Sequence, residues 1–401
     1  MNQSLIQLLE ISEKKSRTII GLMSGTSLDG LDIALCRISG SGAKTEVTLS
    51  KFITVDYTSE QKKLLKKISS VETVELKDLC YMHTRLAIDH AEMINGALKQ
   101  WKISNEDVDC IASHGQSIYH LPARDQKSTE RRINSTLQIA DGDQIAVRTG
   151  IFTISDFRQK HIAHGGEGAP MAALVDRLLF GSDTESRILL NIGGIANFTL
   201  LPSANQSDQA SFTTDTGPGN TLIDNVVQHY FDKPFDEDGR TASSGTARSE
   251  LLNLLLRDEW FQESSSKSTG PEYFNIQWIK QLVSKSGADI KSFKPEDLVA
   301  TVTELSAQTI ADNIQKHCTN SQDAVIYVSG GGARNPVLTE RIQELIPGKK
   351  FRNISELGID PDAKEAVIFA VLANEMLAGE GFPFDADNGT RKVNFGKISF
   401  P

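Results

Sequence analysis

Short apolar runs separated by glycine-rich turns recur along the chain and predict its strands. Residues 17–23 and 31–38 form two strand-like runs joined by the turn SGTSLDG. The same pattern returns at 186–202 in the sequence SRILLNIGGIANFTLLP. A third turn, SGGGARNP at 329–336, follows a buried strand and leads into a helix. One Gly-Gly turn between such runs predicts only a hairpin, so the recurrence is the informative feature.

Apolar residues at helical spacing predict the helices. The longest such segments are 76–101, 295–317 and 361–377, and the last is rich enough in alanine to pack closely against a neighbour. Asn335 is placed to cap a helix that has Pro336 at its first position. The mixture of strands and helices indicates an α/β fold. The repeated strand–turn–strand units indicate two similar halves that face each other across a cleft.

Composition limits the class of protein. The chain has 401 residues, which suggests two or three domains, and its 39% hydrophobic and 23% charged residues are typical of a globular protein. A net charge of −10 disfavours nucleic acid as the main partner. No apolar run approaches the roughly 20 residues of a membrane span, and the N-terminus lacks a secretory signal. We therefore expect a cytoplasmic protein, with reduced thiols at Cys36, Cys80, Cys110 and Cys318.

The glycine-rich turns have the chemistry of phosphate-binding loops. Glycine lets a backbone approach a ligand closely, and successive N–H groups in a turn attract anions. In the first turn, Gly25, Thr26 and Ser27 can donate to phosphate oxygens, and Asp29 can face a phosphate-bound Mg²⁺. A plain structural turn remains the alternative for each one. The chain has neither a P-loop nor a dinucleotide-binding glycine fingerprint.

Seven motifs, in their order along the chain, closely resemble the 1,6-anhydro-N-acetylmuramic acid kinase family of the acetate and sugar kinase/Hsp70/actin superfamily. They are GLMSGTSLDGLDIAL, ASHGQSIYHLP, SDFRQKHIAHGGEGAP, LLNIGGIANFT, DTGPGN, KSTGPEYFN and VSGGGARNPVL. The resemblance extends over residues 18–400. It implies a two-lobed, actin-like and ribonuclease H-like ATPase fold with duplicated mixed sheets around a central cleft. The expected parts are an extension at 1–17, a first lobe at 18–184 joined by 378–401, and a second lobe at 185–377.

The resemblance also implies a nucleotide site. In that superfamily the two glycine-rich hairpins bind phosphate and the SGGG turn binds adenosine. The implied cofactors are ATP and Mg²⁺, with the metal held by Asp29 through water. The expected ATP-binding residues are Gly25, Thr26, Ser27, Leu28, Asp29, Gly30, Leu31, Asp32, Gly193, Gly194, Gly330, Gly331, Gly332 and Asn335.

Two carboxylates match catalytic positions of the family. Asp215 of DTGPGN is the implied general base, which would take a proton from an attacking water, and the glycines and proline around it predict a sharp turn. Glu365 matches a second active-site carboxylate. Its alternative role is structural, because Asp362 and Glu365 have the spacing of a capping box.

The implied sugar-binding residues lie in two loops. They are His114, Gln116, Asp156 and Arg158. For Asp156 and Arg158 a buried structural ion pair is the alternative. The roles of Lys267 and His161 stay open, and His161 stands where the family pattern has an aspartate. Ala140 stands where the family pattern has a glycine.

The resemblance implies an unusual reaction. Water opens the 1,6-anhydro ring at C1 while ATP phosphorylates O6, which gives N-acetylmuramic acid 6-phosphate for peptidoglycan recycling. A homodimer is implied, and neither nucleic acid nor membrane is an expected partner. The alternatives are a conventional hexose or N-acetylhexosamine kinase, a regulatory ATPase like Hsp70 or actin, and a glycosidase-like hydrolase using Asp215 and Glu365. The chain stops without the peptide-binding domain of Hsp70, and a hydrolase leaves the phosphate loops unexplained.

Overall fold

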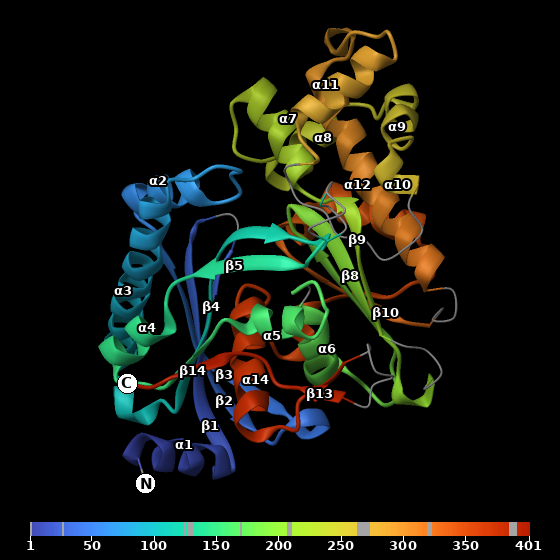
Figure 1. Ribbon diagram of the computed structural model, residues 1–401. Helices are drawn as coiled ribbons and strands as arrows, with labels where there is room; N and C mark the ends of the chain where they lie inside the picture. The colour runs from blue at the N-terminus through green and yellow to red at the C-terminus, as the bar shows by residue number, and fades with distance from the viewer. Residues whose placement is uncertain are drawn as a thin grey trace. The chain divides into compact units, whose positions relative to one another are not determined.

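The computed structural model of the chain is shown in Figure 1. It describes residues 2–25, 28–123, 126, 132–168, 171–206, 211–262, 273–318, 323–384 and 391–401. The chain divides into two compact units. The first consists of Met1–Leu179 and Asp362–Pro401, and the second of Phe180–Pro361.

The first unit is built on a seven-stranded mixed sheet with the strand order β14-β6-β4-β1-β2-β3, and β5 pairs with β4. Strands β1, β2 and β3 form an antiparallel meander, whereas β4 and β6 run parallel to β1. The strands are β1 (Ser16–Ser24), β2 (Gly30–Ser39), β3 (Glu46–Asp56), β4 (Cys110–Leu121), β5 (Ser135–Ile139), β6 (Thr153–Ser155) and β14 (Lys397–Ser399).

Helices cover both faces of this sheet (Figure 1). Ile20 and Leu22 of β1 belong to the core that includes α3 (Leu76–Trp101), whereas Gly21 faces α14 (Lys364–Ala378). A Cβ atom on Gly21 would lie 1.9 Å from the carbonyl oxygen of Ala366, so this crossing requires glycine. The other elements are α1 (Gln3–Glu13), α2 (Ser59–Ile68), α4 (Gly142–Thr149), α5 (Phe157–Ala163), α6 (Ala172–Phe180), β12 (Phe382–Phe384) and β13 (Arg391–Val393).

This packing explains where the unit boundaries lie. Helix α14 packs against β1, β2 and β4, so the segment from Asp362 onward belongs to the first unit. The sequence analysis assigned residues up to 377 to the second lobe. The prediction that the alanine-rich helix packs closely against a neighbour is confirmed by the approach to Gly21.

The second unit repeats the arrangement of the first. Its five-stranded sheet has the order β11-β10-β7-β8-β9, with β7, β8 and β9 antiparallel and with β10 and β11 parallel to β7. If β5, which pairs only with β4, is set aside, the first five strands of both sheets have the spatial order 3-2-1-4-5 when numbered along the chain. The strands are β7 (Arg187–Ile192), β8 (Ile195–Leu201), β9 (Phe212–Pro218), β10 (Val325–Ser329) and β11 (Phe351–Asn353). The predicted α/β fold with duplicated mixed sheets is confirmed.

The helices of the second unit pack on its sheet through one continuous core. Buried residues of α12 (Pro295–His317) and α13 (Pro336–Leu345) join Ile188, Leu190 and Ile192 of β7 in that core. The other helices are α7 (Thr221–Phe231), α8 (Arg240–Ser244), α9 (Ser249–Leu255), α10 (Glu259–Gln262) and α11 (Ile276–Lys285). Among the helices that the structure describes, none is long and apolar enough to cross a bilayer.

Ala140 adopts a backbone conformation that favours glycine. Its φ is +85° and its side chain is 7% exposed, just before Asp141 caps α4. A side chain at positive φ strains the backbone by roughly 1–3 kcal/mol. The glycine of the family pattern at this position therefore has a physical explanation.

Ala140→Gly is expected to stabilise the protein by about 1 kcal/mol, because relief of this strain exceeds the added entropy of the unfolded chain. Thermal denaturation would measure the gain. Ala146→Gly, inside α4, is the matched control and should destabilise by about 1 kcal/mol, as glycine does in a helix. An unchanged or lower melting temperature for Ala140→Gly would contradict the assignment of strain.

Candidate nucleotide and sugar site

Two of the predicted motifs are joined directly in the second unit. The Gly193–Gly194 turn connects β7 to β8, and its carbonyl oxygens accept from the segment that follows β9. Gly193 accepts the N–H of Asn220 at 2.8 Å, and Gly194 accepts those of Gly219 and Thr221 at 2.9 and 3.1 Å. These bonds fix the end of the DTGPGN motif, and with it the start of α7, onto the glycine hairpin.

The SGGG turn lies against the same hairpin. Gly330 has φ +83°, and a Cβ atom there would lie 2.6 Å from the carbonyl oxygen of Ile192 and 2.7 Å from Asn191 Oδ1. A Cβ atom on Gly332 would lie 2.3 Å from Ile192 Cγ2 and 2.9 Å from Asn220 Oδ1. Only glycine permits these approaches. The three motifs, which are distant in sequence, thus converge within one unit.

Asn335 caps α13, as the sequence predicts. Its side-chain oxygen accepts the N–H of Leu338 at 3.2 Å, with Pro336 in the first turn of the helix. Asn335 is 8% exposed. The oxygen is therefore committed to the helix, which limits any contact of Asn335 with a nucleotide to its other atoms.

Asp215 lies within strand β9 rather than in the predicted sharp turn. Its cross-strand partner is Asn197, which in turn pairs with Asn191, and Asn191 pairs with Ser329. Four polar residues thus form a row across β9, β8, β7 and β10. A β-bulge between Ala196 and Asn197 interrupts the ladder beside Asp215, and bulges commonly redirect side chains next to active sites.

The sequence analysis did not identify Asn191, Asn197 or Asn220 as site residues. The signal available for the first two was their symmetric position on either side of the Gly-Gly turn in NIGGIAN, which places them opposite each other in a hairpin. For Asn220 the sequence offered no signal beyond its place at the end of DTGPGN. Its contacts with two other turns depend on the tertiary fold.

In the first unit, the turn between β1 and β2 is tightly packed. Leu28 has φ +58° and donates its N–H to Gly25 at 3.2 Å. The side chains of Leu28 and Leu31 are 5% and 1% exposed and belong to the core. A Cβ atom on Gly30 would lie 2.4 Å from a backbone oxygen of the neighbouring β3. These three residues therefore support the turn. The predicted ligands Thr26 and Ser27, and also Lys267, lie outside the described residues.

Carboxylates gather next to this turn. Thr54 donates to Asp32 Oδ1 at 2.6 Å. Burial raises the pKa of Asp32, and the carboxylates of Asp362 and Asp29 raise it further, against the opposing effect of Thr54. The described residues contain no group of three or more acidic, histidine or cysteine side chains that could hold a metal ion by themselves.

Glu365 is not part of a capping box. Helix α14 begins at Lys364, and its N-cap residue is Ala363, which offers no side-chain cap. The predicted structural role for the Asp362–Glu365 pair is therefore wrong, since the cap lies at another residue. Glu365 occupies the first turn of α14 with its side chain exposed.

The surroundings of Glu365 favour its protonated form. Surrounding protein raises the pKa of this solvent-accessible carboxyl group, and Asp32 and Asp176 raise it further. Lys364 and Arg158 act in the opposite direction. Lys364 itself is paired with Asp176 at 3.0 Å. A carboxyl group with a raised pKa is suited to accept or donate a proton near neutral pH.

The residues expected in sugar-binding loops lie instead in strand β4 and helix α5, where His114 and Arg158 form a partly buried pair. Arg158 donates through Nε to His114 Nε2 at 2.9 Å and through a second nitrogen to the carbonyl oxygen of Gly168 at 3.0 Å. His114 Nδ1 lies 3.0 Å from the carbonyl oxygen of Gly115. Burial, followed by Arg158, lowers the pKa of His114 well below its usual value. His114 is therefore neutral, and both of its ring nitrogens are already engaged.

Asp156 and Arg158 have different partners, so the alternative of an ion pair between them is wrong. Asp156, with φ +55°, pairs with Lys397. The open question about His161 also has an answer, because its Nδ1 accepts the N–H of Gly168 at 2.8 Å. His161 thus helps to hold the same loop that Arg158 contacts.

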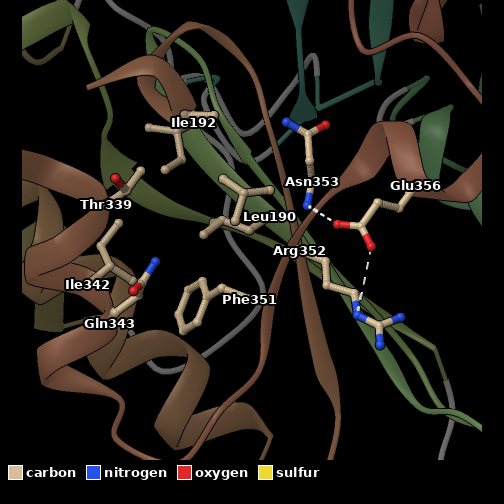
Figure 2. Close-up of a pocket in the computed structure, with 11 residues that line it drawn as sticks. Leu190, Ile192, Thr339, Ile342, Gln343, Phe351, Arg352, Asn353 and Glu356 are labelled. Carbon is tan, nitrogen blue, oxygen red and sulfur yellow. Dashed lines mark hydrogen bonds and ion pairs between the residues drawn. The ribbon is translucent and has the colours of Figure 1, made fainter. Parts of the chain in front are cut away.

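A pocket of about 290 Å³ opens between α13 and the edge of the second sheet (Figure 2). Leu190, Ile192, Ile342 and Phe351 provide apolar walls, and Ala333 connects the pocket to the SGGG turn. Its polar rim is fixed locally, because Glu356 accepts the N–H of Asn353 at 3.2 Å and lies 3.9 Å from Arg352. Apolar walls combined with polar groups at the rim are typical of small-molecule sites.

Comparison with known proteins identifies the family. A family profile described as anhydro-N-acetylmuramic acid kinase matches residues 17–398. The protein of that name from Pseudoalteromonas atlantica is 46% identical over 404 residues, covering 100% of both chains. Its counterpart from Caldanaerobacter subterraneus is 37% identical over 398 residues, covering 98% of this chain and 99% of the relative. One solved structure that matches is the activator of 2-hydroxyisocaproyl-CoA dehydratase from Clostridium difficile with bound ADPNP. The match covers 94% of this chain and 99% of that chain at 12% sequence identity. Its TM-score of 0.40 is too low to carry an argument. The chain belongs to the anhydro-N-acetylmuramic acid kinase family, a family of kinases.

Proposed function

We propose that the chain transfers the γ-phosphoryl group of ATP to O6 of 1,6-anhydro-N-acetylmuramic acid while water opens the anhydro ring. The observation that carries this proposal is the convergence of the NIGG, DTGPGN and SGGG turns in the second unit. Asp215 on β9 is the cross-strand partner of Asn197 on β8, three residues after the Gly-Gly turn. Glycine turns with closely approaching backbones suit phosphate. A carboxylate beside them suits the activation of water.

The reaction balances as follows. Asp215 takes a proton from water, whose oxygen bonds to C1 as the C1–O6 bond breaks. The freed O6 bonds to the γ-phosphorus, and the bond from that phosphorus to ADP breaks. The products are N-acetylmuramic acid 6-phosphate and ADP, and this product would re-enter peptidoglycan synthesis in the cytoplasm. A single incubation with ATP, Mg²⁺ and the anhydro sugar, analysed by mass, tests this. Phosphorylation of the open sugar but not of the anhydro form would favour a conventional sugar kinase.

We infer that the two units bind ATP together, with phosphates at the turns around Gly25 and Gly193. The base of ATP would enter the pocket beside Ala333, whose apolar walls can enclose a flat heterocycle. Asp215 belongs to the second unit and Glu365 to the first, so a common substrate would require the units to close over a cleft. A homodimer is the proposed assembly, on the resemblance alone.

The residues of the first turn suit a magnesium ion that is shared with the nucleotide. Mg²⁺ prefers oxygen ligands and usually keeps several waters, with one or two carboxylates and the substrate phosphates completing its shell. The Asp29 carboxylate contributes to the raised pKa of Asp32, so the two groups lie near each other, whereas the described residues lack a complete metal site. When bound, the ion would neutralise charge on the phosphates. Asp29 and Asp32 would orient it through water.

Asp29→Asn is expected to lower activity mainly by raising the Mg²⁺ concentration needed for half-maximal rate, because one negative charge near the ion is lost. Rates measured across a magnesium titration would show the shift, with the KM for the sugar unchanged. Asp107→Asn, at an exposed position in the same unit, is the matched control. Full activity of Asp29→Asn at limiting Mg²⁺ would contradict the assignment.

On the sugar side, Arg158 is the side chain best placed to contact substrate. His114 holds it from one side and the Gly168 loop from the other, so its guanidinium group is fixed in orientation. His114 would act through Arg158 rather than by touching the sugar. Gln116 is fully buried and bonded to Ser24, which points to a role in the phosphate turn instead.

A further inference from the structure

Tyr57 contacts both ends of the turn that joins β1 to β2. Its backbone N–H donates to the carbonyl oxygen of Asp29 at 2.9 Å, and its hydroxyl lies 2.8 Å from Ser24 Oγ. Ser24 is the last residue of β1, and Asp29 immediately precedes β2. Tyr57 is 3% exposed, so both contacts are shielded from water. One residue thus fixes the two points from which the turn projects.

The side chains around Tyr57 form a continuous chain of hydrogen bonds. Tyr57 Oη lies 2.7 Å from Nε2 of His90, which belongs to α3. On the other side, Ser24 Oγ lies 2.5 Å from Gln116 Oε1. Gln116 Nε2 then donates to the carbonyl oxygen of Gly25 at 3.2 Å. All four side chains are buried.

All hydrogen bonds in this network have the same donor-to-acceptor direction. The carbonyl oxygen of Gly25 can only accept a hydrogen bond, so the amide nitrogen Nε2 of Gln116 must be the donor. The amide oxygen Oε1 of Gln116 therefore faces Ser24. Ser24 then donates its single hydroxyl proton to Oε1 and accepts from Tyr57. The Tyr57 hydroxyl donates its hydrogen bond to Ser24, so its oxygen accepts one from His90 Nε2–H. The chain runs from His90 to the carbonyl oxygen of Gly25, and aligned hydrogen bonds of this kind strengthen one another.

Burial keeps the two titratable members of the hydrogen-bond chain, His90 and Tyr57, in the required protonation state. It lowers the pKa of His90 to about 3, so the ring is neutral. It raises the pKa of Tyr57, so the hydroxyl keeps its proton. His90 Nδ1 is buried and has no hydrogen-bond partner in the part of the chain that the structure describes. An Nδ1 without a proton agrees with the neutral tautomer that carries its proton on Nε2.

We propose that His90, Tyr57 and Ser24 are positioning residues that hold Gly25 and Asp29, on either side of the predicted phosphate ligands, in place for a nucleotide. The inference rests on the proposed binding of ATP by this segment. Fixing these two points in advance lowers the entropy that nucleotide binding would otherwise cost. Gln116 belongs to the same chain, which gives it a role at the nucleotide rather than at the sugar.

Tyr57→Phe is expected to raise the KM for ATP about tenfold, because two buried hydrogen bonds of the chain are lost together. The KM for the sugar should stay unchanged, which a general loss of stability would not produce. Thr149→Val is the matched control, since it removes another buried hydroxyl of the first unit, bonded to Ile145 at 2.8 Å. It should lower the melting temperature without changing either KM.

Two substitutions of His90 test the direction of the chain. His90→Gln keeps an N–H donor at a similar reach and should retain the wild-type KM for ATP. His90→Leu removes the donor and should resemble Tyr57→Phe. Equal effects of the two substitutions would overturn the proposal. In ¹⁵N spectra, His90 should carry its proton on Nε2 and should not titrate between about pH 5 and pH 9.

The outcomes separate this proposal from the proposed function. If the wild-type protein binds no ATP, the proposed function fails. If the wild-type protein binds ATP and the folded Tyr57→Phe variant binds it equally well, the positioning role fails while the function stands. Calorimetric titration with ATP in the absence of sugar measures both.

Discussion

Asp215→Asn is expected to slow turnover at least about a hundredfold, because loss of a positioned general base typically costs 10² to 10⁴ in rate. An amide cannot take the proton from the attacking water, yet it keeps the size of the carboxylate and its place in β9. Nucleotide binding should therefore persist. Steady-state rates and calorimetric titration with ADP measure the two properties separately.

The matched control for this variant is Asp224→Asn. Asp224 lies in α7 of the same unit, and burial, with Asp236 adding to it, raises its pKa to about 6. Its neutralisation removes a carboxylate that is half-buried like Asp215 but has no proposed role, so the rate should stay close to that of the wild type. A near-normal rate for Asp215→Asn would remove Asp215 from the role of general base.

Gly330→Ala is expected to have the second large effect. The added methyl would lie 2.6 Å from a backbone oxygen of Ile192, and backbone cannot move away as a flexible side chain can. We expect an unfolding free energy lower by about 2 kcal/mol and ATP binding at least about tenfold weaker, because the SGGG turn must shift from the hairpin. Denaturant unfolding and ATP titration would measure these changes.

Gly348→Ala provides the control for backbone strain. Gly348 has a similar φ of +87°, but nothing lies within 4 Å of its missing side chain. This variant should lose only the conformational advantage of glycine, about 1 kcal/mol, and should bind ATP normally. Equal effects of the two substitutions on ATP binding would contradict the close contact between the turns as the cause.

The elements that local pattern determines were predictable from the sequence. The strands β1, β2, β7 and β8 and the cap of α13 follow from alternating apolar runs and from turn and capping residues. The edge strand β3 was not predicted; none of its side chains is fully buried, although Ile53 and Val55 pack against the core. The unit to which α14 belongs could not be predicted either. It depends on Gly21, which is far away in sequence and carries no pattern of its own.

The candidate site shows the same division. Glycine-rich turns can be recognised in the sequence, and the NIGG and DTGPGN motifs are joined by hydrogen bonds in the structure. The residues His114 and Gln116 look like exposed ligands in a polar loop, but their partners Arg158 and Ser24 come from other strands and helices. Only the tertiary structure turns such side chains inward. The resemblance implied a binding role for these two side chains, and from their buried contacts we propose a supporting role instead.

The most direct test of the proposed reaction follows the oxygen of water into the product. The protein would be incubated with ATP, Mg²⁺ and 1,6-anhydro-N-acetylmuramic acid in ¹⁸O-labelled water, and the product would be analysed by mass before O1 exchanges. The proposed mechanism predicts label at O1 and none in the ester oxygen at C6, because O6 of the sugar is the atom that attacks phosphorus. Label in the C6 ester oxygen would contradict it.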